Sequence, residues 1–535
     1  MSLNPKVLAK YKEIIERSNL IHSGCPAVYQ LKPKKEEIEP LTRMTVGEKK
    51  TSKTNKTILI VGETGAGKST LINALFNYTI GVKWEDEIWF QIVEEGKRSQ
   101  SESQTSDVIV YEIFGFEDKT LPYSLTIIDT PGFGDTRGAE RDEIIIRRLL
   151  QLFGSDNGVH EVHEVGLVMK AADNRLTDRL MYIFNSMMSL FGKDVEKNIV
   201  ALITHSDGAT PKNVLKALED AKIKCAKNDK NQPAHFLFNN RTNEARTDEE
   251  EFALEFAWKV TEKGMRQLRT FMEKTAPQNM KKTVEVMNSR IRLTECIKNL
   301  KGRIELAELK QTAIRQIQEA LKEHEEEMKK NKNFTIDVDE PYTDKEHVKG
   351  GWWGFWPIRY YDGVTSCKVC KENCHQTTCT WAKTPKECEV MKGGRCTVCT
   401  NKCPVSDHEK DEWKYVSKTR RVQKTVEEIK EKYQKNKTET ENMSSLLENL
   451  EKEMKQLTAE KSKLLYEAYQ HVVTLDQNAL KADSVFTIVH LDFLIEKMKE
   501  EGDTEKVQKL EEMRSREGEG TISALFYRFG KLFKT

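Results

Sequence analysis

Short apolar runs separated by polar segments dominate the first half of the chain, and they predict an α/β fold. Four runs have the length and composition of buried strands, at residues 57–61, 125–128, 199–203 and 235–238. Residues 70–76, which follow the first run, have a helical pattern. This alternation predicts a doubly wound sheet, in which ligands bind beyond the carboxyl ends of the strands.

In the second half, two sets of mostly apolar positions recur at alternating steps of four and three, with some polar residues among them and one place skipped before Met328. The first set comprises Ile297, Leu300, Ile304, Ala307, Gln311, Ile314, Gln318, Leu321 and Met328. The second starts at Val422 and comprises Val426, Ile429, Tyr433, Asn436, Thr440, Met443, Leu447, Leu450, Met454, Leu457, Lys461, Leu464 and Ala468. Such heptads predict two long helices that pair either within the chain or between chains. An antiparallel hairpin within the chain is the favoured interpretation.

Changes in pattern divide the chain into six segments. They are an N-terminal arm at 1–55, an α/β domain at 56–275, a long helix at 276–335, an aromatic and cysteine-rich module at 336–412, a coiled-coil helix at 413–470 and a helical C-terminal region at 471–535. In the arm, residues 7–15 have helical spacing and residues 25–31 an extended pattern. We expect this arm to pack on the α/β domain.

Composition narrows the classes of partner. The 535 residues include 86 basic and 85 acidic side chains, so the net charge does not point to nucleic acid. No apolar stretch has the pattern of a signal peptide or the ~20 residues of a membrane span. Ser2 stands where myristoylation needs glycine, and no C-terminal cysteine is available for prenylation. A cytoplasmic protein is therefore expected.

A glycine-rich loop between the first strand and the first helix supplies the clearest chemistry. Its residues are Gly62, Glu63, Thr64, Gly65, Ala66, Gly67, Lys68, Ser69 and Thr70. They match the pattern G-x-x-x-x-G-K-[ST], in which backbone N–H groups and the helix dipole hold phosphates. Lys68 is expected to reach the β- and γ-phosphates, and the Ser69 hydroxyl to bind Mg²⁺. The chain is therefore predicted to bind a nucleoside triphosphate.

Polar residues at the ends of the other three strands indicate which nucleotide. Asp129 is expected to hold Mg²⁺ through water, and the Gly132 amide to contact the γ-phosphate. Asp207 follows the third strand, where a carboxylate can accept two hydrogen bonds from guanine that adenine cannot donate. Asn239 and Asn240 follow the fourth strand. Four motifs in this order predict a GTPase domain that uses GTP, GDP and Mg²⁺.

The order GETGAGKST, DTPGFGD, LFGKDV, LITHSD and FNN resembles the septin-related P-loop GTPases, and most closely their immune-associated (GIMAP-type) group. The resemblance covers about residues 56–275. It implies that Thr105 is the switch I threonine that coordinates Mg²⁺, and that Asp207 with Asn239 or Asn240 contacts guanine. His205 stands inside the guanine motif, where it either stacks on the base or packs in the fold. The resemblance further implies GTP hydrolysis in a site that a homodimer or oligomer completes.

Phe133 departs from the pattern of Ras-like enzymes, which have a water-orienting glutamine directly after Asp-x-x-Gly. A phenyl ring cannot orient water, so slow intrinsic hydrolysis is expected. Lys68, Thr105 and Gly132 are the predicted catalytic residues. Two functions fit these observations: a self-assembling GTPase switched by its nucleotide, or a scaffold with negligible turnover whose cysteine-rich tip binds a protein partner.

Eight of the eleven cysteines fall between residues 367 and 403. With two histidines they give ten candidate zinc ligands: Cys367, Cys370, Cys374, His375, Cys379, Cys388, Cys396, Cys399, Cys403 and His408. Beside a nucleotide-binding domain without a signal peptide, zinc is favoured over disulfides. Ten ligands suffice for two structural, four-coordinate ions, although the sequence does not show which ligands pair. Because long helices flank the cluster, we expect it at the tip of their hairpin.

Two further patterns leave alternatives open. The segment 350–357 concentrates three of the eight tryptophans, which fit either a small core or an exposed surface for a partner. The helix predicted at 521–535 has an apolar stripe formed by Ile522, Leu525, Phe526, Phe529, Leu532 and Phe533. With cations on its other side, this helix either lies on an anionic membrane or packs on the GTPase domain.

Overall fold

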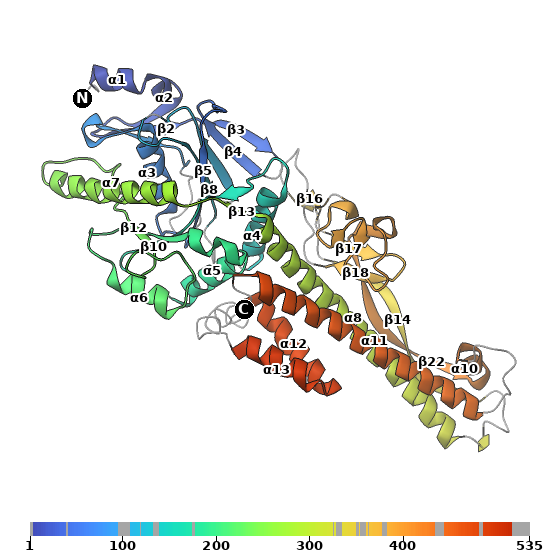
Figure 1. The fold of residues 1–535 in the computed structure, drawn as a ribbon. Helices are drawn as coiled ribbons and strands as arrows, with labels where there is room; N and C mark the ends of the chain where they lie inside the picture. The colour runs from blue at the N-terminus through green and yellow to red at the C-terminus, as the bar shows by residue number, and fades with distance from the viewer. Residues whose placement is uncertain are drawn as a thin grey trace. The chain divides into compact units, whose positions relative to one another are not determined.

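The computed structural model describes the chain apart from residues 1–3, 39–40, 95–107, 118, 132–138, 174–176, 325, 328–333, 349–351, 354–359, 362, 377–381, 383, 434–442, 481–484 and 516–535. The chain forms two compact units (Figure 1). The first comprises Met1–Met287, Asn478–Val485 and Ser515–Thr535. The second comprises Asn288–Gln477 and Phe486–Arg514. Among the described helices, none combines the length and apolar character that crossing a membrane requires.

The first unit is built on an eight-stranded sheet. In spatial order its strands are β12 (His235–Leu237), β11 (Ile199–Thr204), β10 (Glu164–Lys170), β5 (Asn55–Gly62), β8 (Ser124–Asp129), β7 (Ile109–Ile113), β4 (Leu41–Val46) and β3 (Lys34–Ile38). The five from β12 to β8 are parallel to one another, whereas β7 runs antiparallel to β8 and β3 antiparallel to β4. The four predicted strands are thus confirmed in the parallel part of a mixed sheet, which also contains β10, a strand that was not predicted from the sequence.

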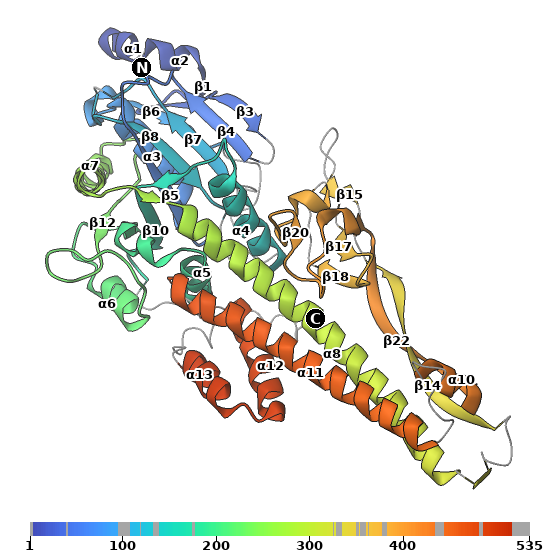
Figure 2. The same ribbon diagram turned by 45° about the vertical axis from the view of Figure 1, so that its right-hand side comes forward.

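Helices cover both faces of this sheet (Figure 2). The figure shows α3 (Lys68–Ile80) and α7 (Glu251–Lys274) on one face and α4 (Ala139–Gly154) on the other. The unit also contains α5 (Asp178–Met188), α6 (Lys212–Asp220), β9 (Glu161–Val162), β13 (Gln278–Asn279) and the short 3₁₀ helices Trp84–Asp86 and Lys193–Asn198. Ile58 and Ile60 of β5 are fully buried, as a central strand covered on both faces requires.

The N-terminal arm is part of the first unit, and it packs on the α/β domain as predicted. Its strands β3 and β4 extend the main sheet, and β1 (Ser18–His22), β2 (Ala27–Leu31) and β6 (Ile88–Gln91) form a second sheet. The predicted arm helix is present as α1 (Pro5–Lys10) and α2 (Lys12–Glu16). Tyr11 is buried between them and donates a hydrogen bond to Asp86 at 2.6 Å.

Two long helices, α8 (Lys281–Glu323) and α11 (Met443–Asn478), run through the second unit side by side (Figures 1 and 2). Cys296 of α8 lies near His471 of α11, whereas Ile314 and Leu321, further along α8, share a core with Leu450, earlier on α11. The helices are therefore antiparallel. They pair within the chain, as the favoured interpretation of the heptads predicted.

A two-stranded antiparallel ribbon corrects the predicted start of the second helix. Its strands are β14 (Thr335–His347) and β22 (Trp413–Thr425), and α10 (Val426–Tyr433) follows directly. Val422, assigned to the helical seam, pairs with Val338 in this ribbon instead. β-Branched residues such as Val422 and Thr425 favour a strand, and cross-strand contacts stabilise it over the helical alternative.

The cysteine-rich module is built from short strands between the two strands of the ribbon. Its elements are β15 (Trp352–Trp353), β16 (Tyr360–Tyr361), β17 (Val364–Cys367), β18 (Glu372–His375), β19 (Met391–Lys392), β20 (Arg395–Cys396), β21 (His408–Asp411) and the 3₁₀ helices Pro385–Glu387 and Val405–Asp407. The rest of the aromatic segment 350–357, and the side chains of β15 and β16, lie outside the described part.

The module does not lie at the tip of the helical hairpin, where it was predicted. It packs on the first half of α8, where Asn299 donates to the carbonyl of Asn373 at 3.1 Å and Arg292 to that of Glu389 at 3.3 Å. The prediction was wrong because the ribbon carries the chain back along the hairpin before the module begins. The C-terminal helical region continues with α12 (Val485–Glu501) and α13 (Thr504–Ser515), and the predicted helix at 521–535 lies outside the described residues.

Candidate functional site

The glycine-rich loop joins β5 to α3 in the conformation that a phosphate-binding loop needs. Gly65 and Gly67 have positive φ values of +79° and +90°, which side-chain-bearing residues rarely adopt. A Cβ atom at Gly65 would meet nothing within 4 Å, so that side of the loop is open. Thr204 donates to the carbonyl of Ala66 at 2.7 Å and thereby ties the loop to the end of β11.

Lys68 and its neighbours provide the groups that an anion would contact. The Lys68 ammonium is buried and donates to the carbonyls of Gly62 at 2.9 Å and Glu63 at 3.0 Å, so it is folded back over the loop. Gly67 begins α3 without a side-chain cap, which leaves N–H groups of the first turn for a ligand. The Thr64 hydroxyl is buried and finds no hydrogen-bond partner among the described residues. These features fit a bound triphosphate.

The predicted Mg²⁺ residues lie beside this loop. Asp129 ends β8 and is fully buried, and the register places it opposite Ile60 of β5, two residues before the loop begins. Thr130 donates to the carbonyl of Ile60 at 2.9 Å, which fixes the end of β8. Ser69 is in the first turn of α3. A carboxylate and a hydroxyl at these places suit a hard cation such as Mg²⁺. Thr105, Gly132 and Phe133 lie outside the described residues.

The predicted guanine residues come together at the ends of β11 and β12, because the Ser206 amide donates to the carbonyl of Phe238 at 3.0 Å. Asp207 is exposed, and its carboxylate accepts from the Ala209 amide at 2.9 Å. His205 is also exposed, with a positive φ of +54°.

The two candidate asparagines differ in their contacts. The Asn240 carboxamide oxygen accepts a hydrogen bond from Thr261 of α7 at 3.2 Å. Asn239 contacts the same hydroxyl only through its backbone amide, at 2.9 Å. The contact with Thr261 therefore engages the carboxamide of Asn240 and the main chain of Asn239.

Comparisons with known proteins agree with this geometry. Residues 52–251 match the model of the Septin family. Septin-5 of Homo sapiens is 28% identical over 176 residues, which cover 30% of this chain and 43% of that protein. Septin-1 of Drosophila melanogaster is 27% identical over 173 residues, with the same shares covered. The first unit therefore contains a septin-type P-loop GTPase domain.

The extent of these matches is limited. The chain spans less than half the length of either septin, and the matched region leaves the cysteine-rich module and both long helices outside it. Among solved structures, Toc33 from Arabidopsis thaliana in complex with GDP and Mg²⁺ is 17% identical, with a TM-score of 0.28, and covers 44% of this chain and 84% of Toc33.

The second unit gathers the predicted zinc ligands into compact groups. Nine of the ten are described, and Cys379 is not. One group contains Cys367, Cys370, Cys399 and Cys403, a second Cys374, Cys396, Cys399 and His408, and a third His375, Cys388 and Glu389. Within each group the ligand atoms lie within 4.8 Å of one another. The described cysteines are free thiols, so they do not form the disulfides that were the alternative to zinc ligation.

Hydrogen bonds around the first two groups have the pattern of metal-bound thiolates. Cys367 Sγ accepts from the amide of Cys370, and Cys396 Sγ from that of Cys399, both at 3.4 Å. His408 donates from Nδ1 to the carbonyl of Pro404 at 2.9 Å, and its buried Nε2 has no partner among the described residues. This arrangement leaves Nε2 directed at the group as a neutral ligand.

Burial disfavours the charged, thiolate form of these cysteines when no cation is bound beside them. It raises the pKa of Cys367 to about 12 and that of Cys370 to about 11. The pKa of Cys399 is instead held well below its usual range, because the Cys374 and Cys396 thiols hydrogen-bond to it. A bound cation would offset the charge of the remaining thiolates, and for this reason the donor set fits zinc.

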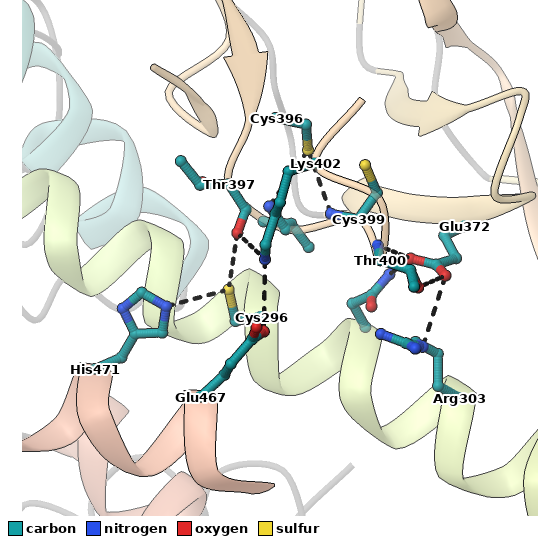
Figure 3. Close-up of polar contacts among 12 residues, drawn as sticks. Cys296, Arg303, Glu372, Cys396, Thr397, Cys399, Thr400, Lys402, Glu467 and His471 are labelled. Atoms are coloured by element: carbon teal, nitrogen blue, oxygen red, sulfur yellow. Dashed lines mark hydrogen bonds and ion pairs between the residues drawn. The ribbon is translucent and has the colours of Figure 1, made fainter. Parts of the chain in front are cut away.

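Contacts with both long helices hold the loop at residues 396–403, which contributes cysteines to the first two ligand groups (Figure 3). Lys402 donates to the carbonyl of Thr397 at 2.8 Å and pairs with Glu467 of α11 at 3.6 Å. Cys296 of α8 lies 3.7 Å from the same carbonyl and 3.8 Å from His471. These contacts place Cys296 beneath the loop rather than in a ligand group.

Glu389 is the functional candidate that the sequence did not reveal. Its carboxylate lies 3.4 Å from Nδ1 of His375, which is 3.1 Å from Cys388 Sγ. One glutamate among 85 acidic residues carries no signal of its own. Only its position directly after Cys388 could have suggested that Glu389 is a candidate metal ligand.

Proposed function

We propose that this chain is a GTP-binding protein that hydrolyses GTP slowly and uses the nucleotide to control self-assembly through its GTPase domain. The observation that carries this proposal is the open loop at Gly65, with the Lys68 ammonium and buried Thr64 hydroxyl beside it and Asp129 at the neighbouring strand end. An exposed carboxylate at Asp207 supports guanine as the base.

The residues suggest how hydrolysis would proceed. Water attacks the γ-phosphate, and the charge that spreads over its oxygens is stabilised by Lys68 and the loop N–H groups. Mg²⁺, held by Ser69, Thr105 and water on Asp129, would neutralise phosphate charge. Phe133 offers no hydrogen bond to orient the water, so the reaction is slow in a single chain. A second GTPase domain would then complete the site.

The finer placement of the protein is part of this proposal. The motif order supports the immune-associated group of septin-related GTPases, and thiol ligands without disulfides support a reducing cytoplasm. The alternative function is a nucleotide-binding scaffold whose cysteine-rich module binds a protein partner. Phe133 and the His205 position, which departs from the usual guanine motif, favour this alternative.

A GTP turnover assay over a range of protein concentrations separates the two functions. If dimers complete the site, the rate per chain rises with concentration, and Lys68→Ala abolishes both binding and turnover. A matched control is Lys216→Ala, which removes an exposed lysine of α6. A rate per chain that is negligible at every concentration, with GTP still bound, would establish the scaffold. Equal affinity for ATP and GTP would contradict the guanine assignment.

We infer that the cysteine-rich module also binds structural zinc. The support is the convergence of thiol and imidazole donors from β17, β18, β20, β21 and their loops on one small volume. With every position filled by protein, zinc would stabilise the module and take no part in hydrolysis. Native mass spectrometry of the purified full chain should show at least two zinc ions, and a metal-free, folded module would contradict the inference.

A further inference from the structure

We propose that the thiolate of Cys399 bridges two metal ions, so that the first two ligand groups form one dinuclear cluster. Cys399 is the one residue that the two groups share. The proposal rests on the zinc binding inferred above and adds how the ions are held. It turns two separate structural sites into a single unit in which one sulfur serves both ions.

The number of donors supports the bridge. The two groups contain seven residues in total: six cysteines and His408. A structural zinc ion takes four protein ligands, so two separate ions would need eight. Seven donors satisfy both ions when one sulfur is bound to each of them. Cysteine sulfur can do this because a thiolate has more than one lone pair, whereas an imidazole nitrogen cannot.

The distances are compatible with this coordination. Tetrahedral zinc with Zn–S bonds of about 2.3 Å places neighbouring sulfur atoms roughly 3.8 Å apart. Cys370 Sγ and Cys403 Sγ are 3.7 Å apart. All ligand atoms in each group lie within 4.8 Å of one another, including the distances from Cys399 Sγ to three partners on each side. The shared sulfur is therefore close enough to both sets without a large movement of the chain.

An eighth donor is not available near the pair among the described residues. His375, Cys388 and Glu389 form their own group, in which His375 is 3.1 Å from Cys388. In the second group, a water molecule would have to enter among Cys374 and Cys399, which are fully buried, and Cys396, which is 2% exposed. Burial of this kind favours a ligand set made entirely by protein.

The total charge of the cluster also favours a Cys399 thiolate that is shared by the two ions. Six thiolates and a neutral imidazole around two zinc ions leave two excess negative charges, fewer than two Cys₄ sites would carry. Backbone amides donate to several of these sulfurs, and the bridging sulfur accepts from the amide of Cys403 at 3.3 Å. Such hydrogen bonds reduce the charge on sulfur. The loop from Cys396 to Cys403 is thus arranged around Cys399.

Metal loss from variants of the full chain tests the bridge. Native mass spectrometry counts the ions lost relative to the unmodified protein. Cys399→Ser should lose two ions, because both sites fall to three donors. Cys370→Ser, a terminal ligand of one site, should lose one. Cys225→Ser removes a buried cysteine of the first unit and should lose none. Cys379→Ser should also lose none, and loss of an ion there would overturn the seven-donor count.

Cobalt substitution of the unmodified chain gives a test that does not depend on whether the Cys399 and Cys370 variants fold. Two Co²⁺ ions joined by one thiolate are magnetically coupled, so the electron paramagnetic resonance signal per cobalt falls as the second ion binds. The titration uses the unmodified chain and Cys388→Ser, which removes a donor of the third group. A signal that grows in proportion to bound cobalt would overturn the bridge and leave zinc binding intact. A chain that binds neither metal would overturn the zinc inference itself.

Discussion

Lys68 and Asp207 show two ways in which a side chain can be prepared for a charged ligand. Lys68 is buried, and two loop carbonyls hold its ammonium in place of phosphate oxygens. The γ-phosphate can replace these carbonyls without uncovering the charge. Asp207 is exposed instead, so water compensates its charge until a base arrives. We therefore propose that the buried lysine supplies affinity for phosphate and the exposed aspartate supplies selectivity for the base.

Exchange of Asp207 for asparagine should change which base is bound. In the proposed base site the carboxylate accepts two hydrogen bonds from guanine, and loss of charge-assisted bonds should weaken GTP binding about 10- to 100-fold. Xanthine has a carbonyl where guanine has an amino group, and the asparagine amide can donate to it. Titration with fluorescent GTP and XTP measures both affinities. Unchanged GTP binding would remove Asp207 from the base site, and Asp220→Asn, on the exposed surface of α6, is the control.

His163 should make the first unit sensitive to acid. Burial, with a smaller effect from Lys56, lowers the pKa of His163 to about 4, and its Nδ1 accepts a hydrogen bond from the Thr57 amide at 3.2 Å. The unfolded chain, with a histidine pKa near 6.5, binds more protons in this interval. Stability is thus fully present above pH 6.5 and falls toward pH 4, by up to about 1.4 kcal/mol per pH unit.

His163→Gln keeps an acceptor for Thr57 and should flatten this pH dependence between 6.5 and 4. Denaturant unfolding at several pH values measures the difference between the two proteins. The comparison is needed because the adjacent Glu164 is fully buried, which raises its pKa and gives a slope of opposite sign. Glu164 is common to both proteins and cancels. Parallel curves for the two proteins would show that His163 does not titrate as described.

At the scale of elements, the hairpin of α8 and α11 depends on a core that the ribbon completes. Ile314, Leu321 and Leu450 pack with Ile336 and Val338 of β14. Leu450→Ala should therefore destabilise the second unit by about 2–5 kcal/mol, because it leaves a cavity in a fully buried site. Glu451→Ala, exposed at the next position, should change stability by less than about 0.5 kcal/mol. Chemical unfolding followed by circular dichroism distinguishes the two, and equal effects would contradict the assigned core.

A chain truncated after Gly520 tests whether the apolar stripe of the helix predicted at residues 521–535 binds membrane or packs on protein. Leu525, Phe526 and Phe529 could each contribute about 1.5–3 kcal/mol when they leave water for a membrane interface. Flotation with anionic liposomes should fall on truncation if the helix binds membrane, and a liposome of neutral lipids serves as the control. Unchanged flotation together with a lower melting temperature would show that the stripe packs on protein instead.

Elements defined by local pattern were predictable, whereas those defined by distant contacts were not. The phosphate loop at residues 62–70 and the seam at Leu450 follow from spacing alone. The strand β22 was missed because Val422 fits a heptad as well as a ribbon, and only its partner Val338, far back in the chain, decides between them. The candidate zinc ligands were predicted by residue type, but the presence of Cys399 in two groups depends on how β17, β20 and β21 fold together.

At the scale of the whole molecule, the predicted nucleotide site and the cysteine groups lie in different compact units. The described nucleotide-loop residues and Asp129 and Asp207 belong to the first unit, and all three cysteine groups belong to the second. The match to the Septin family model ends at residue 251, and the three cysteine groups lie beyond it in the second unit. Each unit has its own core, so their stabilities should be separable.

Removal of zinc should therefore unfold the cysteine-rich module and leave nucleotide binding unchanged. Thiolate–metal bonds supply the folding free energy of so small a module, whereas the nucleotide site is built on an eight-stranded sheet. The experiment treats the full chain with a zinc-selective chelator in excess Mg²⁺ and follows GTP affinity together with proteolysis at residues 364–411. Lys68→Ala is the reciprocal control, which should lose GTP binding and keep its zinc. A loss of GTP affinity that accompanies cleavage of the module would show that the two units fold as one, because only a shared core transmits the loss of metal to the phosphate loop.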